Sequence, residues 1–330
     1  MVIQGKNRRI VTFASSILLA FLLVSAPFLQ SCSLPEQGPA SNPPANQQSN
    51  AASEQPSASN PLASPQSSAV SIHVFDVGEG LAVLIDDGEY EVIIDGGEKR
   101  FGAAFSAYLA SYVDGSIEYV IATHSHADHV GGLTQIYADY QVDHTIYGDT
   151  GTSRQYEDFE NAAKAEPGSD FKNDETETIT LSEGVTLSIL DVVDDDKNTN
   201  NNSVISVLDA GGIKTLITGD AEERTEKLLA SSIGEVTLFI VGHHGSETSS
   251  SQVFLDEIRP EFGIISSQGP IKGSYYNPDI EVLRRLAALG TELYATYRSG
   301  TIVATIDGGS IHLSPPASER ITPENYQNAA

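Results

Sequence analysis

One turn of the sequence concentrates side chains that bind metals. Residues 123–132 have the sequence THSHADHVGG and place His124, His126, Asp128 and His129 within six positions, with the spacing H-x-H-x-D-H. Neutral imidazole nitrogens and carboxylate oxygens are the ligands that zinc and similar divalent cations accept. Three of the eight histidines of the chain lie here, a density that a solvated polar loop rarely reaches. The turn therefore predicts a metal site, and alternate side chains could serve two neighbouring ions.

Three more positions with suitable side chains follow apolar runs, where a buried strand would end. Asp95 precedes two glycines, and we expect its carboxylate to hold a metal-binding histidine or the metal turn through a hydrogen bond. Asp220 follows the run TLITG and could bridge two ions. His243 and His244 are adjacent and flanked by glycines. One of this pair would bind metal, and the other would bind substrate or act as a general acid; the residues leave open which does which.

These side chains need strands that end close together. Apolar runs bounded by glycines predict strands at 71–77, 81–86, 90–95, 117–122, 144–147, 185–190, 203–209, 213–218, 236–241, 262–266, 292–296, 301–306 and 310–313. Helices are expected from Asp128 onward and at 99–113, 154–165, 222–230, 250–258 and 278–289, with a surface loop at 170–177. This pattern predicts an α+β fold of two face-to-face sheets with helices outside. The remaining histidines, His73, His144 and His312, indicate structural roles, with a ligand role as the alternative for His144.

The N-terminal segment indicates export. In residues 1–32, three basic residues precede a long apolar run, and the single cysteine, Cys32, follows the tripeptide LQS. This arrangement is typical of a signal peptide, and it resembles a bacterial lipobox in which Cys32 is lipidated. The alternatives are a plain signal peptide with an incidental cysteine and an uncleaved N-terminal anchor. In each case we expect the rest of the chain to leave the cytoplasm.

Composition divides the remainder of the chain. Residues 33–69 are rich in Ser, Pro, Ala, Asn and Gln and have very few aliphatic side chains, so they predict a disordered tether. Residues 70–314 have the length and the apolar content of one folded domain. Residues 315–330 return to polar, proline-containing sequence and predict a C-terminal tail.

The charge balance disfavours some partners. The first 31 residues hold three of the 18 Lys and Arg residues and none of the 45 Asp and Glu residues, so 15 basic residues face 45 acidic ones in the rest. There the only adjacent basic pairs are Lys99-Arg100 and Arg284-Arg285. Proteins that bind nucleic acid extensively cluster Lys and Arg to neutralise phosphates. The pattern therefore disfavours a processive enzyme of nucleic acids and is typical of a protein that stays soluble in a salty exterior.

Taken together, residues 71–309 resemble the metallo-β-lactamase superfamily, and more closely the hydrolase domain at the C-terminus of the competence protein ComEC. The landmarks occur in family order: FDVGEG at 75–80, IDGG at 94–97, the turn at 123–132, NSV at 202–204, LITGD at 216–220, GHHGS at 242–246 and TIDG at 305–308. The resemblance implies a four-layer αββα sandwich with a two-metal site at one edge of the sheets.

The resemblance also implies roles for individual side chains. Six of them would form the ligand set: His124 and His126 for the first ion, Asp128, His129 and His243 for the second, and Asp220 as the bridge. The two divalent ions, with zinc expected and manganese as the alternative, would deprotonate a bridging water to give the nucleophile. The expected catalytic side chains are Asp128, His244 and Asp95.

Three positions depart from the family pattern. Leu81 stands where relatives usually carry Asp after D-V-G-x-G, and Asn277 stands where they often carry His. A third histidine for the first ion is not evident, and Asp191, Asp194 or a water molecule would take its place.

These features predict an extracytoplasmic, membrane-tethered, metal-dependent hydrolase that cleaves a phosphodiester of nucleic acid or of a cell-envelope polymer. A β-lactamase role is disfavoured because the motifs match the competence-type branch. The alternative is a catalytically impaired binding or regulatory module at the cell surface, which the departures at Leu81 and Asn277 motivate. Retention of all six expected ligands argues against that alternative. Beyond the membrane and the substrate, no feature indicates a protein partner.

Overall fold

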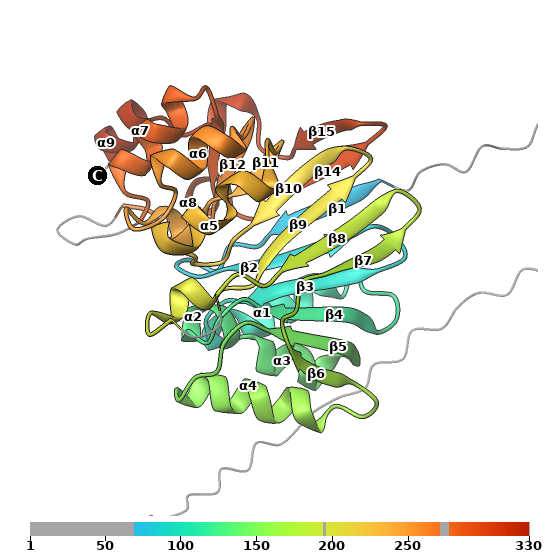
Figure 1. Cartoon of the computed structure of the whole chain (residues 1–330). Coiled ribbons are helices and arrows are strands. Elements are labelled where there is room, and N and C mark those ends of the chain that lie inside the picture. Colours follow the sequence, from blue (N-terminus) through green and yellow to red (C-terminus); the bar gives the residue numbers. More distant parts are fainter. Residues whose placement is uncertain (1–68, 194–195, 271–276, 330) are drawn as a thin grey trace, which may run out of the picture. The chain divides into compact units, whose positions relative to one another are not determined.

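Two β-sheets form the centre of the domain. The computed structural model describes residues 69–193, 196–270 and 277–329. The first sheet has the strand order β15-β14-β1-β2-β3-β4-β5-β6, and the second has the order β13-β12-β11-β10-β9-β8-β7 (Figure 1). The expected signal peptide, the tether and Cys32 lie outside the described residues.

The strands of the first sheet are β1 (Val70–Val74), β2 (Ala82–Asp86), β3 (Glu91–Gly96), β4 (Ile117–Ala122), β5 (Val142–Tyr147), β6 (Asp170–Asn173), β14 (Ile302–Asp307) and β15 (Ser310–Leu313). Those of the second sheet are β7 (Glu177–Ser182), β8 (Val185–Leu190), β9 (Ile205–Ala210), β10 (Ile213–Ile217), β11 (Leu238–Ile240), β12 (Phe262–Ile265) and β13 (Glu292–Ala295).

The parallel parts of both sheets bring the polar strand ends together. Strands β3, β4 and β5 run parallel in the first sheet, and β10, β11 and β12 run parallel in the second. The apolar sequences at the centres of β3, β11 and β12 suit strands that are covered on both faces. Parallel strands of one sheet place their carboxyl ends at the same edge. The turns after β3, β4, β10 and β11 therefore present their polar side chains to one region.

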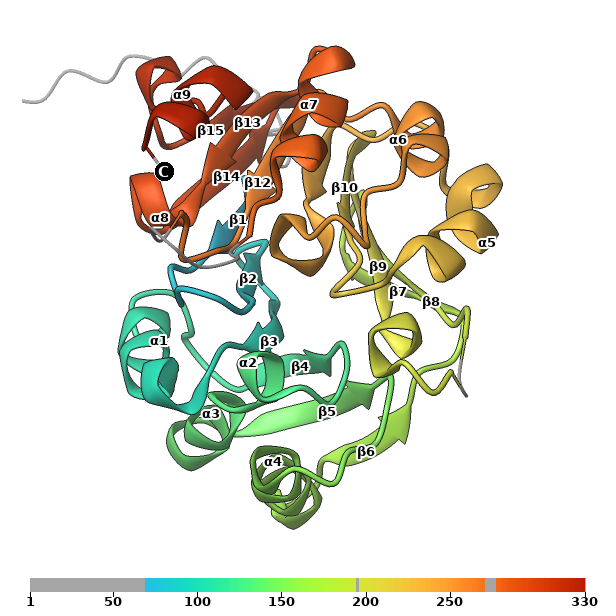
Figure 2. The ribbon, with the colours of Figure 1, turned by 90° about the vertical axis from the view of Figure 1, so that its left-hand side faces the viewer.

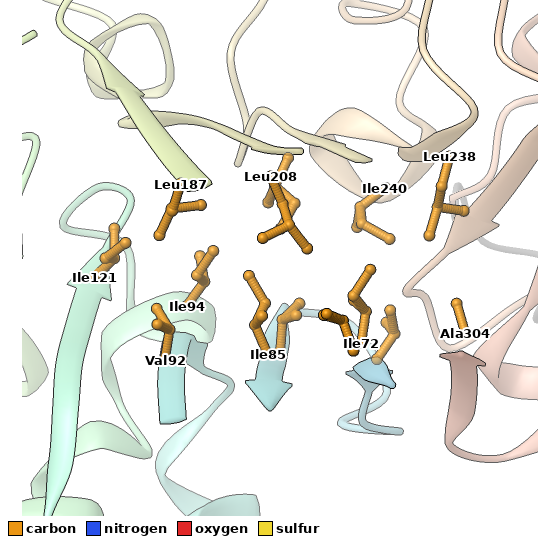
Figure 3. Packing of buried hydrophobic residues seen from close by; sticks show 14 of the residues in the cluster. Ile72, Ile85, Val92, Ile94, Ile121, Leu187, Leu208, Leu238, Ile240 and Ala304 are labelled. Carbon is orange, nitrogen blue, oxygen red and sulfur yellow. The ribbon is translucent and has the colours of Figure 1, made fainter. Parts of the chain in front are cut away.

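The core lies between the two sheets. Ile72, Ile94 and Ile121 of the first sheet face Leu208 and Ile240 of the second, and all five are buried (Figure 3). Full burial of an aliphatic side chain of this size contributes roughly 1.5–3 kcal/mol. The strands whose ends carry the polar side chains of the site are therefore fixed in this apolar core.

Helices cover the outer faces of both sheets (Figures 1 and 2). The helices α1 (Gly102–Leu109), α3 (Leu133–Asp139) and α4 (Arg154–Ala165) bury apolar side chains against the first sheet. The helices α5 (Glu223–Ile233), α6 (Gln252–Ile258) and α7 (Ile280–Ala288) do the same for the second sheet. This arrangement confirms the predicted four-layer αββα sandwich. Among the described residues, no helix combines the length and the apolar content that crossing a bilayer requires.

Two sequence predictions at the margins of the domain were wrong. The stretch 170–177, expected as a surface loop, contains the edge strand β6, which pairs in parallel with β5. The tail expected at 315–330 instead folds onto the domain as the 3₁₀ helix η4 (Ala317–Glu319) and α9 (Pro323–Ala329). Ile321 and Tyr326 are buried in the apolar cluster of the second sheet. Two apolar side chains in a polar segment are too weak a pattern to predict this packing from sequence.

Candidate metal centre

The metal turn connects β4 to a short helix. β4 ends at Ala122, and α2 (Ala127–Val130) begins directly after His126. His124 and His129 are buried, whereas His126 is exposed. The extended backbone at His126 and the single helical turn behind it bring His124, Asp128 and His129 to one region at the edge of the sheets. His126, which the sequence analysis also expected as a ligand, belongs to neither of the close groups of ligand atoms among the described residues.

Hydrogen bonds fix which nitrogen each imidazole presents. His129 Nδ1 lies 2.7 Å from Asp95 Oδ2, and His244 Nδ1 lies 3.1 Å from the carbonyl oxygen of Ser266. Both acceptors require a proton on Nδ1, so both rings present an Nε2 lone pair to the site. His126 is turned the other way, because its Nε2 lies 3.0 Å from Thr199 Oγ1 and its Nδ1 lies 3.0 Å from His124 Nε2.

Asp220 stands at the centre of the cluster. Its Oδ1 lies 3.2 Å from His129 Nε2 and 3.5 Å from His244 Nε2, and its Oδ2 lies 3.6 Å from His124 Nε2. The carboxylate of Asp128 lies 3.5 Å from His244 Nε2. Two ligand groups result, and they share His129: His124, His129 and Asp220 form one, and Asp128, His129 and His244 form the other.

The donor set fits divalent cations. Oxygen and nitrogen donors at 2.0–2.2 Å from a tetrahedral ion lie about 3.3–3.6 Å apart, and the separations around Asp220 are 3.2–3.6 Å. The nitrogens His129 Nε2 and His244 Nε2 face each other at 3.3 Å. Asp220 Oδ1 is buried and has no hydrogen-bond partner among the described residues. A buried carboxylate oxygen without a partner is costly, and a cation at this point would satisfy it.

The side chains shift one another's protonation. Burial alone would lower the pKa of His129, but the carboxylates of Asp220 and Asp95 outweigh it and hold this pKa well above its usual value. Burial and the neighbouring His129 hold the pKa of His124 well below its usual value. Burial would raise the pKa of Asp220, but the imidazoles, His129 foremost, hold it well below its usual value. Positive charge is thus stabilised here, and metal binding would release the proton of His129.

The adjacent histidines take different positions. Both lie in the turn η3 (Gly242–Gly245) with left-handed backbone angles, φ 52° for His243 and 56° for His244. His244 is buried and points into the second ligand group, although the sequence analysis favoured His243 as the ligand. The His243 side chain is 22% exposed, and its Nε2 lies 3.7 Å from Asp220 Oδ2. Its Nδ1 lies 3.0 Å from Thr248 Oγ1 and 3.7 Å from Glu222 Oε1.

The carboxylate of Asp95 fixes the metal turn through hydrogen bonds. Its Oδ1 accepts a hydrogen bond from the backbone N–H of Thr123 at 2.8 Å, and its Oδ2 accepts one from Thr123 Oγ1 at 2.7 Å. The same Oδ2 lies 2.7 Å from His129 Nδ1. The structure thus places Asp95 where the sequence analysis expected it, in contact with a ligand histidine and with the turn.

Several supporting residues escaped the sequence analysis. Thr123 lies between Asp95 and His124, with its Oγ1 3.1 Å from His124 Nδ1. Ser203 Oγ accepts a hydrogen bond from the backbone N–H of Asp220 at 3.1 Å. A hydroxyl or carbonyl group at a loop position carries no recognisable spacing, so only the tertiary contacts reveal these roles.

Other expected positions lie outside the two ligand groups. Asp191 is exposed and belongs to neither group, and Asp194 lies outside the described residues. Asn277 Nδ2 donates hydrogen bonds to Glu79 Oε1 at 3.0 Å and to the carbonyl oxygen of His243 at 3.3 Å. His144 pairs with Asp170 at 2.9 Å, away from the cluster.

Leu81 and His73, which the sequence analysis also singled out, are both buried. Leu81 is buried beside Asp220 and His244, where an Asp would add a further carboxylate. His73 is buried, with Ser71 and Tyr108 as hydrogen-bond partners. Its environment agrees with the structural role that the sequence indicated.

Comparisons with known proteins identify the family of this chain. A model of the metallo-β-lactamase superfamily matches residues 75–269. Recombination protein 2 of Haemophilus influenzae is 29% identical over 238 residues, which cover 70% of this chain and 28% of that protein. Competence protein ComA of Neisseria gonorrhoeae is 28% identical over 250 residues, which cover 73% of this chain and 33% of that protein. The chain thus matches about a third or less of the length of these relatives.

Among solved structures, CmlA, a diiron β-hydroxylase from Streptomyces venezuelae, gives a TM-score of 0.47 at 14% identity, over 74% of this chain and 55% of CmlA. The family match covers more than half of the chain and includes the metal turn, Asp220 and the His243-His244 pair. The resemblance to competence proteins that the motifs predicted is confirmed by the two relatives. The chain belongs to the metallo-β-lactamase superfamily.

Proposed function

We propose that this chain is a hydrolase that cleaves phosphodiester bonds with the help of two divalent metal ions. The observation that carries the proposal is the pair of ligand groups that share His129, with Asp220 within 3.5 Å of an imidazole nitrogen of each group. A structural metal site closes around one ion with four protein ligands, whereas a catalytic site leaves positions open for water and substrate. Here the exposed His126 and the half-buried Asp128 leave the cluster accessible from one side.

The ligands divide between the two ions. His124, His126 and Asp220 would hold the first ion, and Asp128, His129 and His244 would hold the second, with Asp220 also within reach of the second. Bound ions of zinc, or alternatively manganese, supply a water of lowered pKa and a Lewis acid for the attacked phosphoryl oxygen. The ligands themselves do not choose between these metals, because N/O sites accept both.

The remaining side chains position the ligands and handle protons. Asp95 keeps the His129 proton on Nδ1, and the Ser266 carbonyl oxygen does the same for His244. His243 presents Nε2 toward Asp220 from the partly exposed side of the cluster, while Thr248 and Glu222 lie next to its Nδ1. An imidazole held in this way can donate a proton from Nε2 to a leaving oxygen. We therefore assign His243 to substrate binding and leaving-group protonation.

The names of the relatives support a phosphodiester of nucleic acid as one substrate. Both are named for recombination or competence, processes that involve DNA. The large excess of acidic residues argues for occasional cleavage of an anionic chain rather than for processive degradation. A phosphodiester polymer of the cell envelope has the same scissile group, and it is the second source of substrate.

A metal-dependent assay tests this proposal. The full-length chain, loaded with zinc or manganese, is expected to contain close to two ions and to hydrolyse bis(p-nitrophenyl) phosphate. His126→Ala should abolish turnover. The matched control is His144→Ala, which removes an imidazole outside the cluster and should retain activity. Turnover of only a lactam or a thioester would refute the phosphodiesterase assignment, and bound metal without turnover of any ester would favour the binding module.

The export and tethering of the chain are part of the same proposal. The basic start, the apolar run and Cys32 after the tripeptide LQS support a lipid-anchored protein on the outer face of the membrane. Cells expressing the full-length chain should retain it in the membrane fraction, and Cys32→Ser should release it or leave its precursor unprocessed. An unchanged distribution and mobility of Cys32→Ser would contradict lipidation.

A further inference from the structure

A cavity opens beside the candidate metal centre. It has a volume of about 330 Å³, and it is lined by Lys99, Arg100, Ala127 and Gln155 together with three carboxylates, those of Glu79, Glu98 and Asp128. Because Asp128 belongs to the second ligand group, the cavity begins at the metal cluster itself. Cavities of this size are large enough to hold a small polar group with its neighbours.

Two basic side chains, Lys99 and Arg100, line this cavity, and tertiary structure brings a third, Arg154, close to Lys99. Lys99 and Arg100 lie in the 3₁₀ helix η1 (Lys99–Phe101), and Arg154 is the first residue of α4, next to Gln155. The helix α2 packs against both η1 and α4. Lys99 Nζ lies 2.9 Å and Arg154 Nε lies 3.9 Å from the same oxygen of Asp158. The sequence shows only one isolated basic pair here, because Arg154 is more than fifty residues away.

The present partners of these cations leave them available to an anionic ligand. The side chains of Lys99, Arg100 and Arg154 are 60%, 61% and 87% exposed. Arg100 pairs with Glu98 at 3.0 Å, and its guanidinium also lies over the ring of Phe101, 4.8 Å from the centroid. Exposed ion pairs contribute little to stability, so a phosphate can displace these carboxylates at small cost. Arginine in particular suits a phosphate, because its planar guanidinium can donate two parallel hydrogen bonds to two phosphate oxygens.

We propose that this cavity binds a phosphate group that flanks the scissile phosphodiester in a chain of several phosphodiesters. Lys99 and Arg100 provide the positive charge in the lining, and Arg154 adds a cation beside Lys99. Gln155 provides a neutral amide, and Asp128 marks the end at which the scissile group meets the metals. The assignment as a substrate subsite rests on the proposed function, whereas binding of the anionic chain does not require turnover. The chemistry is that of a polymer with repeated phosphates, which single-stranded nucleic acid and poly(glycerol phosphate) share.

Binding of a labelled oligomer tests this proposal. The probe is fluorescein-labelled decathymidylate, and its anisotropy is measured with the metal-loaded, full-length chain over a range of salt concentrations. The double variant Lys99→Gln/Arg100→Gln is expected to raise Kd about tenfold. Each neutralised phosphate of a single strand contributes about 0.7 to the slope of log Kd against log salt, and the cavity takes one phosphate, so the slope should fall by about 0.7. A merely structural role would not change this slope.

Two further double variants serve as controls. Lys99→Arg/Arg100→Lys preserves both charges and should restore most of the affinity. Lys227→Gln/Arg284→Gln removes the same net charge from exposed ion pairs on α5 and α7, and should leave Kd unchanged. Metal content and melting temperature identify a variant that fails to fold, in which case the charge-preserving variant decides. Equal losses in both Gln variants, or an unchanged Kd in Lys99→Gln/Arg100→Gln, would overturn the proposal.

The same measurements separate the subsite from the proposed function. If the unmodified chain binds the oligomer through Lys99 and Arg100 but hydrolyses no phosphodiester, binding at the cavity stands and the proposed function fails. If it hydrolyses bis(p-nitrophenyl) phosphate but does not bind the oligomer, or binds it independently of the two residues, the cavity proposal fails. A ten-unit glycerol phosphate oligomer competes in a parallel series, and tighter binding than decathymidylate would identify an envelope polymer as the source.

Discussion

Replacement of Asp95 by Asn should weaken metal binding without unfolding the turn. Asp95 is fully buried at φ 59°, a left-handed backbone conformation that Asp and Asn adopt more often than most other non-glycine residues. The two side chains have the same shape, and the amide oxygen can still accept the hydrogen bond from the Thr123 backbone N–H. The substitution therefore changes one atom, the Oδ2 that faces His129 Nδ1, into an N–H donor.

This change reverses the tautomer of His129. With an N–H donor at 2.7 Å, the imidazole must accept at Nδ1 and carry its proton on Nε2, the atom that faces Asp220 and His244. A protonated nitrogen cannot bind a metal, so binding requires either the unfavourable tautomer or rotation of the amide. Loss of a carboxylate that orients a ligand histidine typically costs 10–100-fold in metal affinity, which corresponds to about 1.4–2.7 kcal/mol.

Competition with a chromogenic zinc chelator measures the effect. Asp95→Asn should bind the ion that His129 would hold 10–100-fold more weakly, and its melting temperature without metal should change little. The control is Asp139→Asn, an exposed carboxylate that accepts hydrogen bonds from Ser106 and Gln135 away from the site. If His129→Ala loses metal while Asp95→Asn keeps the affinity of the unmodified chain within twofold, the tautomer argument is wrong.

Three further predictions concern stability. Burial lowers the pKa of His73 to about 4; because the unfolded value is near 6.5, stability is fully present above pH 6.5 and falls by up to about 3 kcal/mol toward pH 4. Urea unfolding of His73→Gln should show a flatter pH dependence, and an unchanged one would refute this role. A Cβ at Gly131 would lie 2.5 Å from the Ala127 carbonyl oxygen and 2.6 Å from the backbone nitrogen of Lys99. Gly131→Ala should therefore lower the free energy of unfolding in urea by about 1–3 kcal/mol and weaken oligomer binding. An unchanged free energy of unfolding would show that α2 and η1 need no close approach. Ile321→Ala removes a side chain that is only 3% exposed and should cost about 2–4 kcal/mol, whereas a loss below 0.5 kcal/mol would mean that the C-terminal segment does not pack as described.

The elements with strong local patterns were predictable. The strands β3, β4 and β10 are apolar runs that end in a polar side chain, and the metal turn has a fixed spacing behind β4. Such segments specify their conformation through nearest neighbours and burial, so their positions follow from the sequence. By contrast, β6 is an edge strand of four mostly polar residues, Asp170–Asn173, and it exists because β5 offers it a partner. A pairing of this kind has no local signature.

The site shows the same division between local and distant contacts. Sequence by itself predicted that the metal turn would supply several ligands, because residues one to five positions apart on one turn must stay together, and His124, Asp128 and His129 do lie in the close groups of ligand atoms. It also determined the family, since the order of the motifs along the chain is a linear property. Only the tertiary structure decided that His244 rather than His243 joins Asp128 and His129, because the left-handed backbone of both residues sets the direction of each ring. Likewise, Arg154 joins Lys99 and Arg100 only because α2 draws η1 and α4 together, and no spacing along the chain encodes that contact.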